Sequence, residues 1–140
     1  GAAAISAGST ATEADMAWAE DILGSVGTVV RVPEAQLDAV TGLAGSGPAY
    51  LFLVAEALID AGEAVGLDRA TSEALVTLLF VGSAALLKER GQPAELRTMV
   101  TSPGGTTAAG LRVLEEKAVK EAFQQAVVAA KARSIELGRG

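Results

Sequence analysis

The segment from Arg69 to Arg90 limits the possible folds more than any other part of the chain, because its apolar residues are not confined to one face. A helix with this pattern must be buried on most of its sides. The 140-residue chain has few other helices to cover it, so we expect a partner chain to do so. The apolar positions around this predicted helix are Leu75, Val76, Leu78, Leu79, Phe80, Val81, Leu86 and Leu87.

The chain is predicted to be helical almost throughout from Glu34 onward. Pro48 suits a first helical turn, Gly66 is a stop signal, and Asp68 is a suitable helix cap. We therefore expect residues 33–140 to form an all-helical domain. The expected helices cover residues 34–43, 48–65, 69–90, 93–100, 105–115 (or 106–115) and 117–137.

Residues 1–32 have a different pattern. Thr12, with Asp15 three residues later, is typical of a capped helix start. A β-branched run follows at residues 28–32, and residues 3–5 are a second possible strand ahead of the helix. A lone β–α–β unit cannot bury both faces of its sheet. We therefore expect residues 1–32 to be a fragment of a larger α/β domain whose earlier strands are missing.

Charge and composition exclude several classes of function. The net charge is −6 and the eleven Lys and Arg residues are scattered, which disfavours a nucleic-acid partner. The chain has no Cys and no His, which removes disulfides, thiolate nucleophiles, imidazole bases and the usual zinc sites. Any chemistry must therefore use hydroxyls, carboxylates, the backbone or a cofactor.

Two segments without charges raise the question of a membrane. Residues 39–55 contain three glycines and a proline, and residues 74–87 are shorter than the roughly 20 residues that a spanning helix needs. Residues 1–13 lack the basic region and the long apolar run of a secretory signal. We expect no membrane span and a cytoplasmic protein.

Two glycine-rich segments precede predicted helices: GLAGSGPAY at 42–50 and TSPGGTTAAG at 101–110. The N-terminus of a helix has unpaired N–H groups and a partial positive charge, so it attracts phosphate or carboxylate. The alternative is that both segments are only tight turns between packed helices. Neither has the spacing of a nucleotide-binding fingerprint. An anion site is therefore a hypothesis at both places.

Both segments belong to longer stretches that resemble a known family. Residues 38–50, DAVTGLAGSGPAY, and residues 93–116, PAELRTMVTSPGGTTAAGLRVLEE, are similar to the C-terminal half of pyrroline-5-carboxylate reductase, the last enzyme of proline biosynthesis. The resemblance covers essentially the whole chain, and TSPGGTT is its most specific element. It implies a mainly α fold, in which an interlocked helical dimerisation domain (33–140) follows a short βαβ-like remnant of a dinucleotide-binding domain (1–32).

The resemblance also implies a substrate site. The family reduces 1-pyrroline-5-carboxylate, a cyclic imine with a carboxylate, to L-proline. The Ser102 hydroxyl and the backbone N–H groups around Gly105 and Thr106 would bind that carboxylate, and glycine at 104 and 105 permits close backbone approach. The Thr107 hydroxyl would lie near the ring nitrogen as the catalytic hydroxyl.

The resemblance places Ser46, Gly47 and Pro48 near the nicotinamide of an NADPH or NADH cofactor. The glycine-rich fingerprint of the family's first half is missing, so we expect no tight cofactor binding and no activity from this chain alone. The expected partner is a second copy, with larger rings of dimers as a further possibility. A non-catalytic dimerisation module and a small-anion binding protein are the alternatives.

One row of carboxylates on the predicted 48–65 helix suggests a cation site. Glu56, Asp60 and Glu63 recur at helical spacing, and oxygen ligands of this kind bind divalent cations. A row of this type is more often solvated. We therefore expect no metal here.

Overall fold

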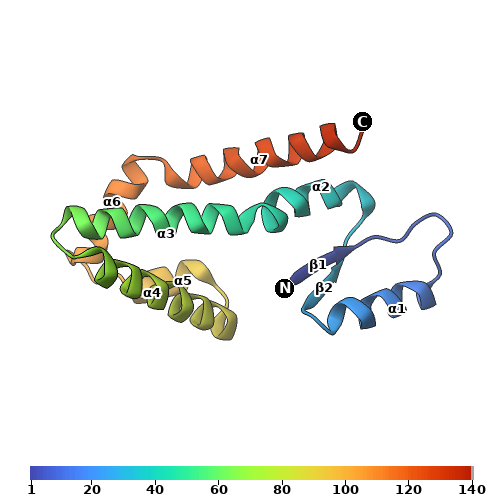
Figure 1. Ribbon diagram of the computed structural model, residues 1–140, viewed down its shortest axis with the longest axis horizontal. Coiled ribbons are helices and arrows are strands. Elements are labelled where there is room, and N and C mark those ends of the chain that lie inside the picture. The colour runs from blue at the N-terminus through green and yellow to red at the C-terminus, as the bar shows by residue number, and fades with distance from the viewer. Residues whose placement is uncertain (140) are drawn as a thin grey trace. The chain divides into compact units, whose positions relative to one another are not determined.

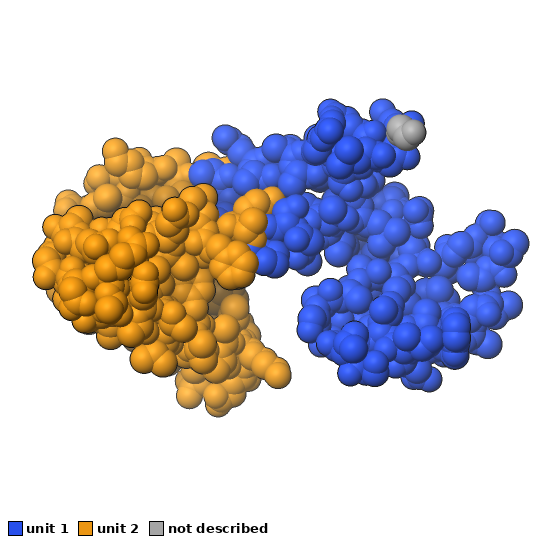
Figure 2. All heavy atoms as spheres, viewed as in Figure 1, with its two compact units in different colours: residues 1–48, 122–140 blue, residues 49–121 orange. Residues whose placement is uncertain are grey.

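The computed structural model describes residues 1–139, which form two compact units. Among these residues, 1–48 and 122–139 make up the first unit, and 49–121 make up the second (Figures 1 and 2). The fold is mainly helical with a two-stranded parallel sheet near the N-terminus, as the sequence predicted. Each unit is described separately.

The first unit begins with a β–α–β arrangement. Strand β1 (Ala2–Ile5) pairs in parallel with β2 (Thr28–Arg31), in a register that puts Ala2 opposite Thr28, and helix α1 (Glu13–Gly24) connects them. The expected cap is present, because the Thr12 hydroxyl accepts from the Asp15 N–H and the Asp15 carboxylate accepts from the Thr12 N–H. The two strands and the capped helix are therefore confirmed.

Arg31 links β2 to α1. Its guanidinium donates to the carboxylates of Glu20 and Glu13 at 2.6 Å. These bonds hold the pKa of Glu20 below its usual range. The ion pairs link α1 to the end of β2.

The chain continues as one helical stretch rather than ending in a turn. The 3₁₀ turn η1 (Glu34–Gln36), helix α2 (Leu37–Val40) and a π-helical turn η2 (Thr41–Gly45) lead directly into α3 (Gly47–Ala64). The interpretation of residues 42–50 as a tight turn before a helix is therefore wrong. The Ser46 N–H donates to the Thr41 carbonyl at 2.9 Å and keeps the backbone helical.

The π-helical turn packs against the part of α7 (Val119–Leu137) that belongs to the first unit. A Cβ atom at Gly42 would lie 2.9 Å from the Val127 carbonyl oxygen, so only glycine permits this approach. The Ser134 hydroxyl also donates to the Asp38 carboxylate at 2.6 Å. These two contacts attach the end of the chain to the segment that follows the sheet.

The second unit contains most of α3 together with α4 (Arg69–Arg90), α5 (Pro93–Met99) and α6 (Thr106–Glu116). Their bounds agree with the predicted helices to within one or two residues. The last helix begins at 119 instead of 117, because Ala118 has a left-handed backbone with a φ of 54° that interrupts the helix. Asp68 caps α4 as expected, since its carboxylate accepts from the Thr71 N–H at 2.8 Å.

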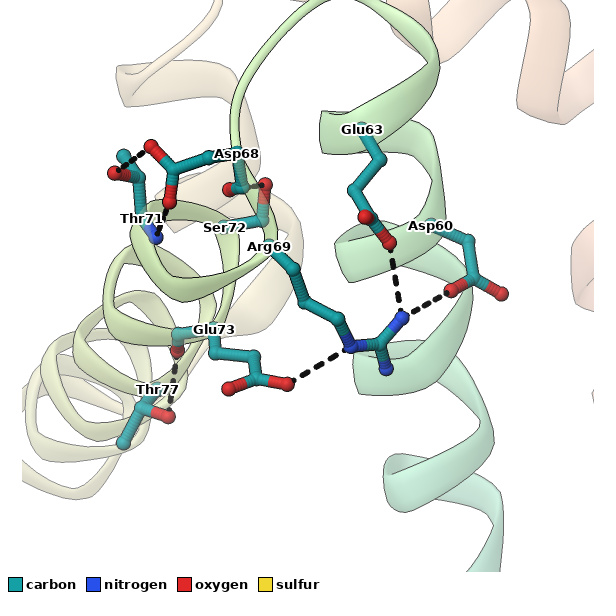
Figure 3. Close-up of polar contacts among 8 residues, drawn as sticks. All are labelled: Asp60, Glu63, Asp68, Arg69, Thr71, Ser72, Glu73 and Thr77. Atoms are coloured by element: carbon teal, nitrogen blue, oxygen red, sulfur yellow. Dashed lines mark hydrogen bonds and ion pairs between the residues drawn. The ribbon is translucent and has the colours of Figure 1, made fainter.

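Helices α3 and α4 are joined at Gly62 and at Arg69. Ser72 is the most buried side chain of the described chain, and a Cβ at Gly62 would lie 2.5 Å from its hydroxyl oxygen. Arg69 pairs with Asp60 and Glu63 on α3 and with Glu73 on α4 (Figure 3). Two of the three carboxylates considered for a cation therefore face a guanidinium.

The apolar residues of α3 and α4 are mostly exposed within the single chain. Only Met16 and Val76 are buried among the apolar residues of the described part. The helical stretch Glu34–Ala64 and helix α4 are both long and apolar enough to cross a membrane. Each helix is longer than the charge-free segment inside it, 39–55 or 74–87, on which the prediction of no membrane span was based. Helices that pack at interfaces share these properties, so length and hydropathy alone do not define a span.

Candidate functional site

The segment between α5 and α6 forms a tight turn whose shape follows from its residues. The Gly105 N–H donates to the Ser102 carbonyl at 3.0 Å, which closes a four-residue turn. Pro103 has the backbone angle that the second position requires, and Gly104 takes the third position with a φ of 70°. Two glycines after a proline therefore reverse the chain immediately before α6.

Gly105 is the N-cap of α6 and has an extended backbone, with a φ of −77° and a ψ of 174°. It has no side chain, so no cap hydrogen bond covers the first N–H groups of the helix. A Cβ at this position would lie 2.7 Å from Ser102 Oγ, so the Ser102 hydroxyl lies beside the helix start. The helix start and the hydroxyl together form a small cluster of hydrogen-bond donors.

Thr106 and Thr107 are the first two residues of α6, and both are exposed. Residues 101–107 include no ionisable side chain, so this cluster offers hydroxyls and backbone N–H groups but no acid. Such a cluster can bind a carboxylate through the helix dipole and can hydrogen-bond a neighbouring polar atom. The structure brings Ser102, Gly104, Gly105, Thr106 and Thr107 together at one helix start.

A groove of about 320 Å³ runs between α5 and α6 beside this turn. An ion pair crosses it from Arg97 Nη1 to Glu115 Oε1, at 3.6 Å. The Thr101 hydroxyl donates to the Arg97 carbonyl at 2.6 Å and so links the turn to α5. The groove is lined by Arg97, Thr98, Thr101, Ala108, Leu111, Arg112 and Glu115.

Reasoning from the sequence did not select Arg97, Thr101 or Glu115. A threonine near a helix end often donates its hydroxyl to the carbonyl four residues earlier, so the position of Thr101 was a signal for its bond to Arg97. The pairing of Arg97 with Glu115 depends on how the two helices pack. No sequence spacing identifies it.

Ser46, Gly47 and Pro48 lie at the junction of η2 and α3 and belong to the first unit. Ser46 and Gly47 are half-buried and Pro48 is exposed. Because the helical backbone continues through Thr41–Gly45, these residues do not form a free helix N-terminus. The anion-cradle interpretation of this segment is therefore wrong, and its proximity to a nicotinamide stays a prediction.

The connection between β1 and α1 does not fit the phosphate-binding part of a dinucleotide. The connection between β1 and α1 covers residues 6–12 and has one glycine, Gly8, where a dinucleotide fingerprint needs three. The helix that follows is capped by the Thr12 side chain. Any pyrophosphate would need residues other than those between β1 and α1.

The fold and the turn define a helical domain that follows two parallel strands and has a cluster of hydrogen-bond donors at the start of α6. Residues 34–137 match the family described as pyrroline-5-carboxylate reductase dimerisation. The chain belongs to this family. Neither the family nor the names of the relatives below describes a membrane protein.

Three relatives illustrate the match. A pyrroline-5-carboxylate reductase from Corynebacterium melassecola is 51% identical over 121 residues, which are 86% of this chain and 45% of the relative. The structure of a pyrroline-5-carboxylate reductase from Coxiella burnetii superposes with a TM-score of 0.91 at 40% identity, over 96% of this chain and 51% of that one. The Plasmodium falciparum pyrroline carboxylate reductase with NADP bound gives 0.85 at 37% identity, over 94% and 53%. The chain spans about half the length of the relatives that it matches.

Proposed function

We propose that this chain is the substrate-binding and dimerisation part of an enzyme that reduces 1-pyrroline-5-carboxylate to L-proline. The observation that carries the proposal is the uncapped start of α6 with the Ser102 hydroxyl beside it, in a chain that belongs to the reductase dimerisation family. This cluster of donors suits a small carboxylate. The absence of an acid from the loop suits a substrate whose imine nitrogen takes its proton from solvent.

Each residue of the turn has a part in this proposal. Ser102 Oγ and the N–H groups of Gly105 and Thr106 hold the carboxylate, and the glycines at 104 and 105 let it approach the backbone. Thr107 is the second residue of α6, and its hydroxyl meets the ring nitrogen, where it donates to the imine or accepts from the protonated iminium. These contacts orient the imine carbon and keep the substrate in place.

The hydride comes from a bound nicotinamide cofactor, NADPH or NADH. Ser46, Gly47 and Pro48 are the residues of this chain that we assign to its nicotinamide end. The pyrophosphate must be held elsewhere, because the β1–α1 connection has no cradle for it. The chain by itself therefore binds the cofactor weakly.

The proposed assembly is a homodimer formed through the apolar faces of α3 and α4. Phe52 is 72% exposed and Leu78 is 68% exposed in the single chain, and a second copy would cover them. The description of the matching family supports a dimer. Larger rings of dimers and a cytoplasmic location are further parts of the proposal.

A non-catalytic dimerisation module is the second candidate, because the matching family is described by dimerisation. A fusion that places the N-terminal half of the Corynebacterium melassecola relative before this chain separates the two. We expect the fusion to oxidise NADPH in the presence of 1-pyrroline-5-carboxylate and the chain alone to leave NADPH unchanged. A folded fusion with no NADPH oxidation would contradict the reductase proposal.

A further inference from the structure

The turn at 100–105 is connected to α5 mainly through its backbone. The Val100 N–H donates to the Leu96 carbonyl at 3.2 Å, and the Thr101 N–H donates to the Thr98 carbonyl at 3.0 Å. The Thr101 hydroxyl adds a bond to the Arg97 carbonyl. The position of residues 100 and 101 therefore depends on the position of α5.

The second part of the turn belongs to α6. Gly105 occupies the N-cap position of this helix, and its carbonyl accepts from the Ala109 N–H at 3.1 Å. The shape of the turn thus depends on the relative position of α5 and α6. Within residues 1–139, the Arg97–Glu115 pair is the salt bridge that joins these two helices.

We propose that Arg97 and Glu115 are positioning residues, whose ion pair holds the turn at 100–105 in the conformation that binds the substrate carboxylate. Arg97 contacts both the turn and α6. Its carbonyl accepts a hydrogen bond from the Thr101 hydroxyl, and its guanidinium pairs with Glu115 across the groove. The inference rests on the proposed function for the identity of the ligand. The effect of the ion pair on the conformation of the turn does not depend on the proposed function.

The expected size of the effect is modest, because both side chains are partly exposed, at 42% and 66%. An exposed ion pair changes an equilibrium by about two- to fivefold. The pair should also weaken as salt is added, since charges at the surface are screened. Variants that remove one of the two charges should therefore change the measured equilibrium by about two- to fivefold.

The first measurement is amide exchange in the full chain, followed by NMR. We expect Arg97→Met and Glu115→Gln to speed exchange at Thr101 and Gly105 by about two- to fivefold. The Leu67 N–H, which donates to the Gly62 carbonyl in the same unit, should not change. The charge-swapped variant R97E/E115R should restore protection. Unchanged exchange at Thr101 and Gly105 in both single variants overturns the inference, whatever the enzyme does.

The second measurement is steady-state kinetics of the fusion. The KM for 1-pyrroline-5-carboxylate should rise by about two- to fivefold in each single variant, with kcat nearly unchanged. The control is Glu136→Gln, which removes the 2.7 Å pair between Arg133 and Glu136 on α7 and should leave KM unchanged. Faster exchange without a rise in KM would overturn the link to substrate binding. An inactive fusion would contradict the proposed function and leave the exchange result to decide the role of the ion pair.

Discussion

Gly105 and Ser102 are in such close contact that a Cβ on Gly105 would lie 2.7 Å from Ser102 Oγ and 3.2 Å from the Ser102 carbonyl oxygen. The backbone of Gly105 has a negative φ, which any residue can adopt. The glycine is therefore required by space and not by backbone conformation. An added methyl group would push the hydroxyl away from the helix start while leaving the turn able to form.

We accordingly expect Gly105→Ala to raise the KM for 1-pyrroline-5-carboxylate in the fusion without changing its circular dichroism spectrum. The displaced group is the end of a flexible side chain, so the fold should tolerate the change. The control is the same substitution in a Ser102→Ala background, where the nearest side-chain atom to the new methyl is 3.8 Å away. If Gly105→Ala raises KM by the same factor in the Ser102→Ala background, displacement of the hydroxyl is not the cause.

The two hydroxyls give a direct test of the proposed substrate contacts. A hydrogen bond to a charged group contributes about 1.5 to 3 kcal/mol, so Ser102→Ala should lower kcat/KM by about tenfold or more. Thr107→Val keeps the shape of the side chain and removes the hydroxyl, and it should lower kcat/KM to a similar extent. Initial rates at low substrate concentration measure both. If kcat/KM is unchanged in both variants, these two residues do not contact the substrate.

Most helix bounds could be predicted because their signals are local. Thr12 and Asp68 cap helices through residues three positions later, and Pro93 begins α5 as the pattern indicated. The same holds for the turn before α6, where Pro103 and Gly104 determine the backbone. The composition of these segments is sufficient to specify their structure.

The features that could not be predicted depend on residues far apart in the chain. The π-helical turn at Thr41–Gly45 packs against α7, and Asp38 accepts a hydrogen bond from Ser134, 96 residues away. The glycines at 42–47 have the composition of a loop, but here the backbone is helical and Gly42 allows close packing against α7. For the same reason, the Arg97–Glu115 pair had no signal in the sequence.

The packing of α3 on α4 should be sensitive to Gly62. A Cβ there would lie 2.5 Å from the Ser72 hydroxyl oxygen and 3.0 Å from Ser72 Cβ, and Ser72 is only 2% exposed. Gly62→Ala should lower the free energy of unfolding by about 1–3 kcal/mol, because overpacking forces the two helices apart. Thermal melting followed by circular dichroism measures this change.

The matched control for Gly62 is Gly110→Ala on α6, where an added Cβ meets nothing within 4 Å. Alanine is favoured over glycine in a helix by about 0.5–1 kcal/mol, so this variant should melt at the same or a higher temperature. Equal destabilisation by both substitutions would indicate that contact with Ser72 is not what makes Gly62 necessary.

Asp68 gives the stability of the chain a dependence on pH. The Thr71 backbone N–H and hydroxyl both donate to its carboxylate and hold its pKa below its usual range (Figure 3). A carboxyl whose pKa is lower in the folded state contributes stability above its unfolded pKa of about 3.9, and the contribution is lost as the pH falls through the folded value. The α4 cap should therefore weaken only in acid.

The measurement compares the melting temperatures of the unsubstituted chain and of Asp68→Asn across a range of pH. Asparagine also caps helices but carries no charge to interact with the helix dipole. We expect the variant to melt at a lower temperature near neutral pH, and the difference to shrink below about pH 4. Asp21→Asn, in the interior of α1, is the control. A difference that stays constant into acid would argue against the charge of Asp68 as the source of its effect.

The last prediction concerns the apolar faces of α3 and α4. Val76 is the apolar residue of α4 that is buried, whereas Leu75, Leu78 and Leu79 are each more than half exposed on neighbouring turns. Contiguous apolar patches of several hundred Å² are rare on monomers, so this face should be covered by a second copy of the chain. The residues that would form such an interface lie within residues 34–137, the region that matches the dimerisation family. The dimer should therefore form from this chain without further sequence.

Light scattering at low micromolar concentration should give about twice the mass of one chain. Leu78→Glu should reduce that mass toward a single chain, because it places a charge in the middle of an apolar interface. Trp18→Glu is the matched control, since Trp18 is as exposed as Leu78, at 69%, but lies on α1, outside residues 34–137. It should leave the dimer mass unchanged. A folded monomer of the unsubstituted chain would show that the apolar faces of α3 and α4 do not require a partner.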